Sequence, residues 1–383
     1  MPVVFVHGVN VRRSALYDQT IARRDAYFHA HLPPAVLGGV DVFNPYWGDS
    51  GAKFSWNLAS VPSGPYETFG TAPLLQLIAE IAPGTAPDDA GNLLLSIARK
   101  RSLLEVIDLL WGAQAHAPGP FDTSPALIAE SAQRATTYAA ATSGPAWLAD
   151  VRSDDQLISR LLRESAQTCE TTETFGPSEV FNALQWAIEA LRQLPHETAA
   201  ATVSALRGRG NAILARFIGD ACVYVTTRGR PGEHGPIVQI VVDALQQAAQ
   251  SRTSRQPLVV VAHSLGGIIA YDALTSFAPT IPCDVLITVG SQIALFEEMK
   301  QFVASDPKIP NKVQPRAPKP ANVKHWINVF DLVDALSYSA GNVFSDVKDV
   351  KFNVSPSPLA AHVSYFERPT FYQCLSAWLA KTR

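Results

Sequence analysis

A strand-like segment that ends at a serine is the part of the sequence best suited to chemistry. Residues 257–274 read PLVVVAHSLGGIIAYDAL, which predicts a buried strand, an abrupt turn at Ser264 and a helix beginning near Leu265. A serine on such a turn stands at the carboxyl end of a parallel sheet, where ligands bind in open α/β folds. We therefore take Ser264 as a candidate nucleophile.

The turn around Ser264 needs small residues two positions to either side, because a tight turn presses those positions together. They are Ala262 and Gly266, so alanine replaces the first glycine of the usual G-x-S-x-G pattern and adds one methyl group. His263 precedes the serine as a supporting residue, and Gly267 would allow close helix packing. Short strings of this kind occur by chance, and the alternative is an ordinary turn between a strand and a helix.

A serine hydroxyl is a weak nucleophile until a base accepts its proton, so a downstream histidine oriented by a carboxylate is required. His325 and His362 follow Ser264 in the chain. His325 opens the strand HWINVF, at the wrong end of a parallel sheet, which favours a structural role. His362 lies in a loop between the last expected strand and the final helix, so we predict that it is the general base. The alternative is a solvated loop histidine.

Two aspartates follow the strand that ends at Phe330, and either could orient His362. Asp331 comes directly at the end of the strand, whereas Asp334 lies three residues further on, where its carboxylate can turn toward the histidine. We favour Asp334 as the acid. Asp331 then caps the turn or supports its neighbour.

Acyl transfer also requires hydrogen-bond donors for a developing oxyanion, and fixed backbone amides serve well. We expect one from Leu265 and the other from Val9, in the loop after the first strand, where Gly8 allows close approach. His7 could be taken for a base, but its position before Gly8 favours a role in shaping this loop.

The elements that position these residues alternate between strands and helices, which predicts an α/β fold with a mostly parallel sheet flanked by helices. The expected strands are Val3–Val6, Val40–Phe43, Leu258–Val261, Val285–Val289, Ile327–Phe330 and, more weakly, Val350–Val354. Phe371, Leu375 and Leu379 recur at helical spacing, which predicts a C-terminal helix over Tyr365–Lys381.

A large helical insertion is expected before the nucleophile strand. Residues 62–216 are rich in alanine and leucine with helical periodicity, including a helix over Leu75–Ile81, so residues 1–61 and 217–383 would form the core. The insertion is a candidate cap or lid, and a helical bundle with only a structural role is the equal alternative.

Four segments together resemble the lipase and esterase branch of the α/β-hydrolase superfamily: VVFVHG, AHSLGG, the aspartate after WINVF, and HVSY. The resemblance covers about Met1–Trp47 and Ile218–Arg383. It implies ester hydrolysis through an acyl-enzyme without a cofactor, and an insertion able to influence substrate entry. The first strand resembles the third strand of the full fold, which implies a shortened sheet of about six strands.

Composition excludes several other classes of function. The 383 residues are 47% hydrophobic with a formal net charge of −3, which fits a large core and gives no basic face for nucleic acid. No secretory signal or membrane span is expected, although transient contact with a membrane surface is compatible with the sequence. The scattered Cys169, Cys222, Cys283 and Cys374 predict reduced thiols, no metal site and a cytoplasmic protein.

The substrate is left open by the sequence. Apolar insertion residues would suit an acyl chain, which favours a lipid or other hydrophobic ester, although the same residues would also serve as packing; they are Trp56, Leu103, Leu104, Leu109, Leu110 and Trp111. A thioesterase or amidase would use the same residues. A catalytically silent interaction protein that keeps the fold is the alternative from another class. The oligomeric state is not predicted.

Overall fold

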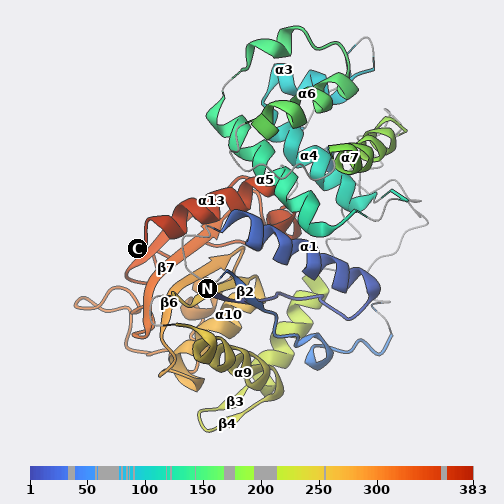
Figure 1. Ribbon diagram of the computed structural model, residues 1–383. Helices are drawn as coiled ribbons and strands as arrows, with labels where there is room; N and C mark the ends of the chain where they lie inside the picture. The colour runs from blue at the N-terminus through green and yellow to red at the C-terminus, as the bar shows by residue number, and fades with distance from the viewer. Residues whose placement is uncertain are drawn as a thin grey trace.

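The computed structural model describes most of the chain (Figure 1). The residues described are 1–32, 39–56, 58, 77–78, 81–82, 85, 87–88, 91–117, 119–120, 123–142, 144–167, 177–193, 214–253, 256–354 and 360–382. Cys169 and most of the expected helix Leu75–Ile81 lie outside them. Cys222, Cys283 and Cys374 are free thiols.

A parallel sheet of six strands forms the centre of the molecule. In chain order the strands are β1 (Pro2–Val6), β2 (Asp41–Phe43), β5 (Val259–His263), β6 (Cys283–Val289), β7 (Val323–Phe330) and β8 (Val347–Lys351). Their spatial order is β2-β1-β5-β6-β7-β8, and every neighbouring pair is parallel. Val6 lies opposite Ala262, and His263 lies opposite Val289. The carboxyl ends of β1, β5 and β6 therefore meet at one edge, as the α/β prediction requires.

The last strand differs from its prediction. The sequence favoured Val350–Val354, but β8 begins three residues earlier and ends at Lys351. Val354 instead donates its backbone N–H to the Asp331 carboxylate at 2.6 Å. A carboxylate at the end of β7 thus binds an amide that the strand ladder would otherwise have used.

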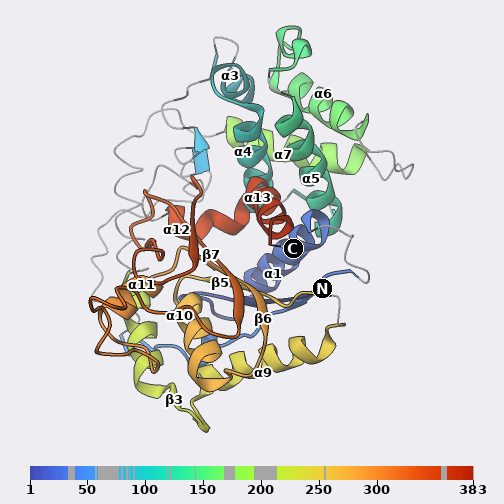
Figure 2. The ribbon, with the colours of Figure 1, turned by 90° about the vertical axis from the view of Figure 1, so that its left-hand side faces the viewer.

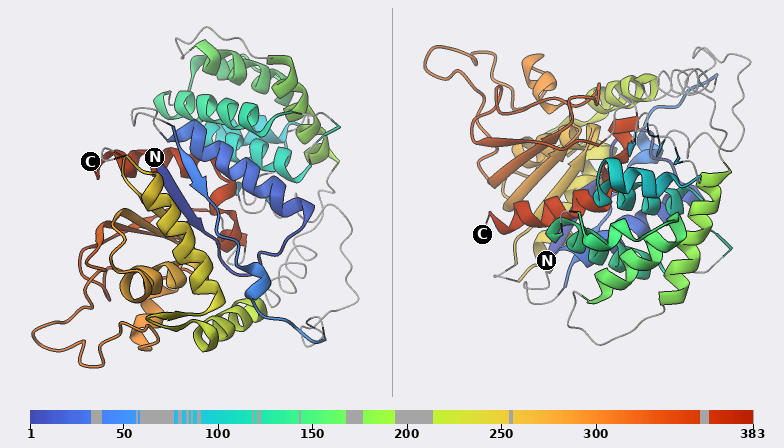
Figure 3. Two further views of the ribbon diagram at one scale, coloured as in Figure 1. Left: turned by 60° about the horizontal axis from the view of Figure 1, so that its bottom comes forward. Right: turned by 90° about the horizontal axis from the view of Figure 1, so that it is seen from above.

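Helices cover both faces of the sheet because side chains alternate along each strand (Figure 3). Val4 and Val6 pack with α9 (Pro236–Ser251) and α10 (Leu265–Asp272) on one face. Val3 and Phe5 pack on the other face, with α1 (Ala15–His31) and α13 (Pro369–Ala380). The expected C-terminal helix is confirmed, although it divides into a short turn, Tyr365–Glu367, and α13 because Pro369 starts a new helix.

Helices of residues 62–216 form a further layer (Figure 2). They are α3 (Leu93–Lys100), α4 (Leu103–His116), α5 (Pro125–Ala141), α6 (Asp154–Gln167) and α7 (Pro177–Arg192). α5 packs along α1, and both α4 and α5 contact α13. Residues 214–227 form a further helix that leads to the hairpin of β3 (Gly229–Arg230) and β4 (Glu233–His234). Within the described part of the chain, no helix combines the length and apolar character needed to cross a membrane.

Candidate active site

The backbone at Ser264 makes the sharp turn that the sequence predicted. β5 ends at His263, Ser264 has φ 54° and ψ −128°, and α10 begins at Leu265. A non-glycine residue at positive φ is strained, and the surrounding structure must hold it in place. Here the Ser264 N–H donates to the Val289 carbonyl at 2.9 Å, which fixes the turn to the end of β6.

The glycines around Ser264 allow close packing, as expected for Gly8 and Gly267, but Gly266 is needed for a reason that differs from the prediction. A Cβ on Gly266 would lie 2.3 Å from the carbonyl oxygen of Val6, so the glycine makes room for strand β1 rather than for the turn itself. A Cβ on Gly267 would lie 2.3 Å from Ser291 Oγ, and one on Gly8 would lie 2.7 Å from Ser264 Cβ. Side chains at these positions would collide with fixed groups.

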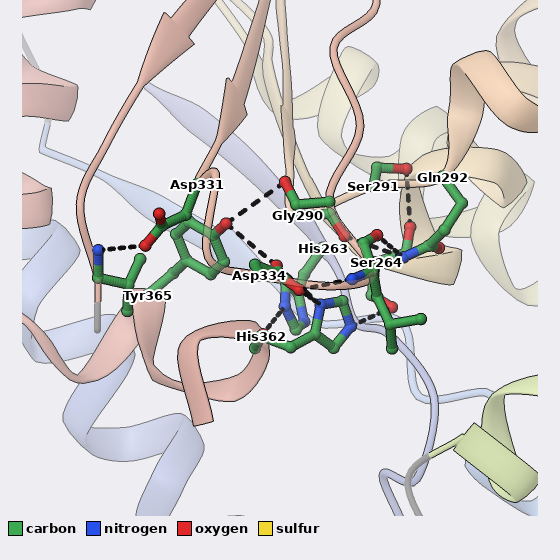
Figure 4. A network of polar contacts seen from close by, with 12 residues as sticks. His263, Ser264, Gly290, Ser291, Gln292, Asp331, Asp334, His362 and Tyr365 are labelled. Atoms are coloured by element: carbon green, nitrogen blue, oxygen red, sulfur yellow. Dashed lines mark hydrogen bonds and ion pairs between the residues drawn. The ribbon is translucent and has the colours of Figure 1, made fainter. Parts of the chain in front are cut away.

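His362 lies beside Ser264, although 98 residues separate the two in the chain (Figure 4). Its Nε2 lies 2.8 Å from Ser264 Oγ, and its Nδ1 lies 3.0 and 3.1 Å from the two carboxylate oxygens of Asp334. The histidine is on a short helix, α12 (Ala360–Ser364), rather than in the expected loop. If Nδ1–H donates to the carboxylate, Nε2 is left to accept the serine proton.

The two aspartates have separate roles in the structure. Asp334 contacts His362 and also accepts hydrogen bonds from the Tyr365 hydroxyl at 3.1 Å and the Leu336 N–H at 2.9 Å. Asp331 accepts instead from backbone amides, at 3.0 Å from Val333 and at 2.6 Å from Val354. Only the favoured aspartate is therefore brought to the histidine, and the other anchors the chain after β7.

His263 contributes to the site by a hydrogen bond to the backbone of His362. Its Nε2 lies 2.7 Å from the carbonyl oxygen of His362, a contact in which the ring nitrogen donates. Burial, together with the nearby His362, lowers the pKa of His263 to about 3, so the ring is neutral at ordinary pH. His263 thus positions His362. The sequence marked it only as a neighbour of the serine, since nothing in the local pattern says where its side chain points.

His7 shapes the loop after β1, in line with the favoured interpretation. Its Nδ1 donates to the Gly8 carbonyl at 2.8 Å, and its Nε2 accepts from the backbone N–H of Trp47 at 3.2 Å. The ring stacks on Trp47 with 4.6 Å between centroids. Burial lowers the pKa of His7 to about 3, so both nitrogens keep these roles across ordinary pH.

The backbone donors expected for an oxyanion lie beside the serine. Leu265 is the first residue of α10, so its N–H has no acceptor within the helix. Val9 follows Gly8, whose backbone packs against Ser264. These placements fit the expected donor pair.

Sequence reasoning missed Asp220, which holds the loop after β1. This fully buried carboxylate accepts from Asn10 N–H at 3.2 Å, Ala52 N–H at 2.7 Å and Arg12 Nη2 at 2.9 Å. Asn10 itself has φ 65°, a strained value that such an anchor can maintain. In the sequence, Asp220 is a single aspartate within an apolar helical segment, a pattern too common to indicate a site.

The three central side chains are shielded from solvent. Ser264, Asp334 and His362 are 0%, 3% and 1% exposed. Solvent therefore does not reach Ser264 in this conformation.

Comparison with protein-family models, curated proteins and solved structures gives no match for this chain. Its function is therefore inferred from the residues of the site.

Proposed function

We propose that the protein is a serine hydrolase of the α/β-hydrolase kind that cleaves carboxylic esters through an acyl-enzyme. The observation that carries the proposal is the hydrogen-bonded series from Ser264 Oγ to His362 Nε2 at 2.8 Å and from His362 Nδ1 to Asp334 at 3.0 Å. A histidine in this position both activates the serine and protonates the leaving group. The positive φ of the serine on its strand-to-helix turn supports the same reaction.

In the proposed reaction, Ser264 Oγ attacks the ester carbonyl carbon while its proton passes to His362 Nε2. Asp334 stabilises the imidazolium, and the amides of Leu265 and Val9 donate to the oxyanion. Collapse of the intermediate breaks the bond to the alcohol, which takes the proton from Nε2 and leaves an acyl-serine. Water activated by His362 then releases the acid and restores the serine. Thioesters and amides can follow the same course.

The apolar insertion residues give little support to a lipid substrate. Leu103, Leu109, Leu110 and Trp111 are at most 6% exposed and belong to the core cluster between the helices. Trp56, in contrast, is 83% exposed. Packing explains the buried residues, so we propose a carboxylic ester without assigning it a long acyl chain.

Labelling with a fluorophosphonate probe tests the proposal, because phosphonylation requires an activated serine. We expect an adduct on Ser264, located by mass spectrometry, that is abolished in Ser264→Ala and strongly slowed in His362→Ala. His325→Ala is the matched control, since this half-buried histidine lies near the amino end of β7, and it should be labelled as the wild type is. The absence of an adduct in wild-type protein, with detergent present to favour opening, would refute the proposal.

A further inference from the structure

A pocket of about 240 Å³ adjoins the candidate active site. It lies between the loop after β1, helix α1 and the segment that follows His362, and its lining includes Gly8, Val9, His263 and Val363. The backbone of Gly8 packs directly against Ser264, and Val363 is the next residue after the histidine. The volume is below the usual range of about 300–1,000 Å³ for small-molecule sites, which favours a small group.

Arg24 provides a rigid hydrogen-bond donor in this pocket. Its Nε and Nη2 donate to Asp25 Oδ1 at 3.2 and 3.0 Å, and Nη2 also donates to the side-chain oxygen of Asn44. The guanidinium lies 3.7 Å from the centroid of the Phe5 ring. No hydrogen bond from Nη1 to another described residue is found, and Arg24, which is 7% exposed, lines the pocket. Because Asp25, Asn44 and Phe5 hold the guanidinium in place, it can bind an acceptor with little further loss of side-chain entropy.

The lining carries two arginines against one carboxylate, and Arg24 also forms an ion pair with Asp25 at 3.0 Å. Arg23 and Arg24 both line the pocket, and Arg23 is half-buried without a hydrogen bond or ion pair to any described residue. The acidic residue of the lining, Glu367, lies 3.5 Å from His116 Nε2. Burial raises the pKa of Glu367, but His116, Arg23 and Arg368 outweigh this effect and lower it to about 2, so the carboxylate is ionised and shares the charge of Arg23 with any bound anion. His263 and His7 also line the pocket, but burial keeps both rings neutral by lowering their pKa values to about 3.

We propose that this pocket binds a carboxylate of the substrate through Arg24 Nη1, with Arg23 adding positive charge at the same site. The inference rests on the proposed function, because it makes the preferred substrate an ester that carries a carboxylate. Phe5, on which Arg24 lies, is in β1, and Gly8, beside the nucleophile, is two residues past its end, so their backbones are at most about 10 Å apart. The carboxylate is therefore separated from the scissile carbonyl by a short chain.

Two sets of esters with one chromogenic leaving group test the proposal. One set has acyl chains of increasing length that end in a carboxylate, and the other has matched chains that end in a methyl group. A third arm places the carboxylate on the alcohol, which distinguishes the two sides of the ester. We expect the wild type to prefer a carboxylated ester by about 10- to 100-fold in kcat/KM, the usual contribution of a charge-assisted hydrogen bond.

The variants are Arg24→Met, Arg24→Lys and Arg23→Ala, with Arg13→Ala as the control. Arg13 is an exposed arginine in the loop after β1. Its guanidinium lies over the Tyr46 ring, and it does not line the pocket. Arg24→Met should abolish the preference, Arg24→Lys and Arg23→Ala should reduce it, and Arg13→Ala should leave it unchanged. Fluorophosphonate labelling of Ser264 reports whether each variant is folded and active. If Arg24→Met does not fold, the Arg23→Ala result decides.

Binding to Ser264→Ala protein separates this proposal from the proposed function. Dicarboxylates from succinate to suberate, titrated by calorimetry, should bind this variant and should bind the Arg24→Met double variant at least tenfold more weakly. Such binding, combined with no esterase activity and no fluorophosphonate adduct in the wild type, would support the pocket and overturn the proposed function. Labelling of Ser264 with equal rates on the carboxylated and methyl-ended esters would overturn the pocket and keep the hydrolase.

Discussion

Replacing Asp334 with asparagine should place the His362 proton on the wrong nitrogen. Each carboxylate oxygen of Asp334 has a donor besides the histidine: Leu336 N–H at 2.9 Å on Oδ1 and the Tyr365 hydroxyl at 3.1 Å on Oδ2. The Leu336 amide is fixed and can only donate, so the oxygen of an asparagine must face it. The new NH₂ group then occupies the Oδ2 position, 3.0 Å from His362 Nδ1.

An NH₂ group in that position repels a proton on Nδ1 and donates to the unprotonated nitrogen, and we expect this effect to outweigh the contact that Nδ1–H could keep with the asparagine oxygen at 3.1 Å. The remaining proton is on Nε2, and Nε2 can no longer accept the proton of Ser264. The Tyr365 hydroxyl does not oppose this arrangement, because it can turn toward Ser337 Oγ at 3.4 Å. We expect Asp334→Asn to lower kcat by about 10⁴-fold near neutral pH, equivalent to about 5.5 kcal/mol of transition-state stabilisation.

The assay is the rate of p-nitrophenyl ester hydrolysis together with the rate of fluorophosphonate labelling. Asp331→Asn is the matched control, because Asp331 binds two backbone amides and does not contact His362. It should lower the thermal midpoint and change kcat by less than about tenfold. An Asp334→Asn enzyme with nearly normal kcat, or a larger loss in Asp331→Asn, would refute the assignment of the acid.

Three further predictions concern the support of the site. Gly266→Ala should lower the free energy of unfolding by about 3 kcal/mol or more, because its methyl group meets a β1 carbonyl oxygen at 2.3 Å; Gly112→Ala, which meets only the flexible end of Leu77, should be nearly neutral in the same denaturant titration. Asp220→Asn should lower kcat more than it changes KM, because its single remaining acceptor oxygen cannot bind all three donors that hold the loop after β1. Arg12→Met is the control, since it leaves both backbone amides bound to Asp220. Equal kcat values for the two variants would contradict this role. The free energy of unfolding should fall as pH drops below about 6.5, because His7 accepts a proton in the unfolded chain but not in the folded protein, where its pKa is about 3. His7→Gln should reduce the slope of this free energy against pH. An unchanged slope would contradict the prediction.

The sequence predicted the parts of the site that depend on local pattern and chain order. A run of β-branched residues before Ser264 and an apolar helix after it predict where the turn falls, although contacts with β1 and β6 hold its strained backbone. His362 and Asp334 were identified because a base and an acid must follow in the chain, and the structure brings both to the serine. The choice between Asp331 and Asp334 required geometry, since both are close to the end of β7.

The supporting contacts could not be predicted because they join residues far apart in the chain. Asp220 binds the amide of Asn10, 210 residues away, and His263 binds the carbonyl of His362, 99 residues away. No spacing rule relates such pairs. The end of β8 was also predicted wrongly, and here too a contact between separated residues is involved, because Val354 donates its N–H to the Asp331 carboxylate.

The described helices of residues 62–216 pack against α1 and α13, the two helices next to the site. α1 directly follows the loop that carries Val9, and α13 directly follows the segment that carries His362. α5 packs on α1, and α4 packs on α13, where Asp108 accepts a hydrogen bond from Thr370 at 3.0 Å. The two helices next to the loop and to His362 therefore pack against the same helical layer. This arrangement favours a structural role for α4 and α5, one of the two alternatives that the sequence left open.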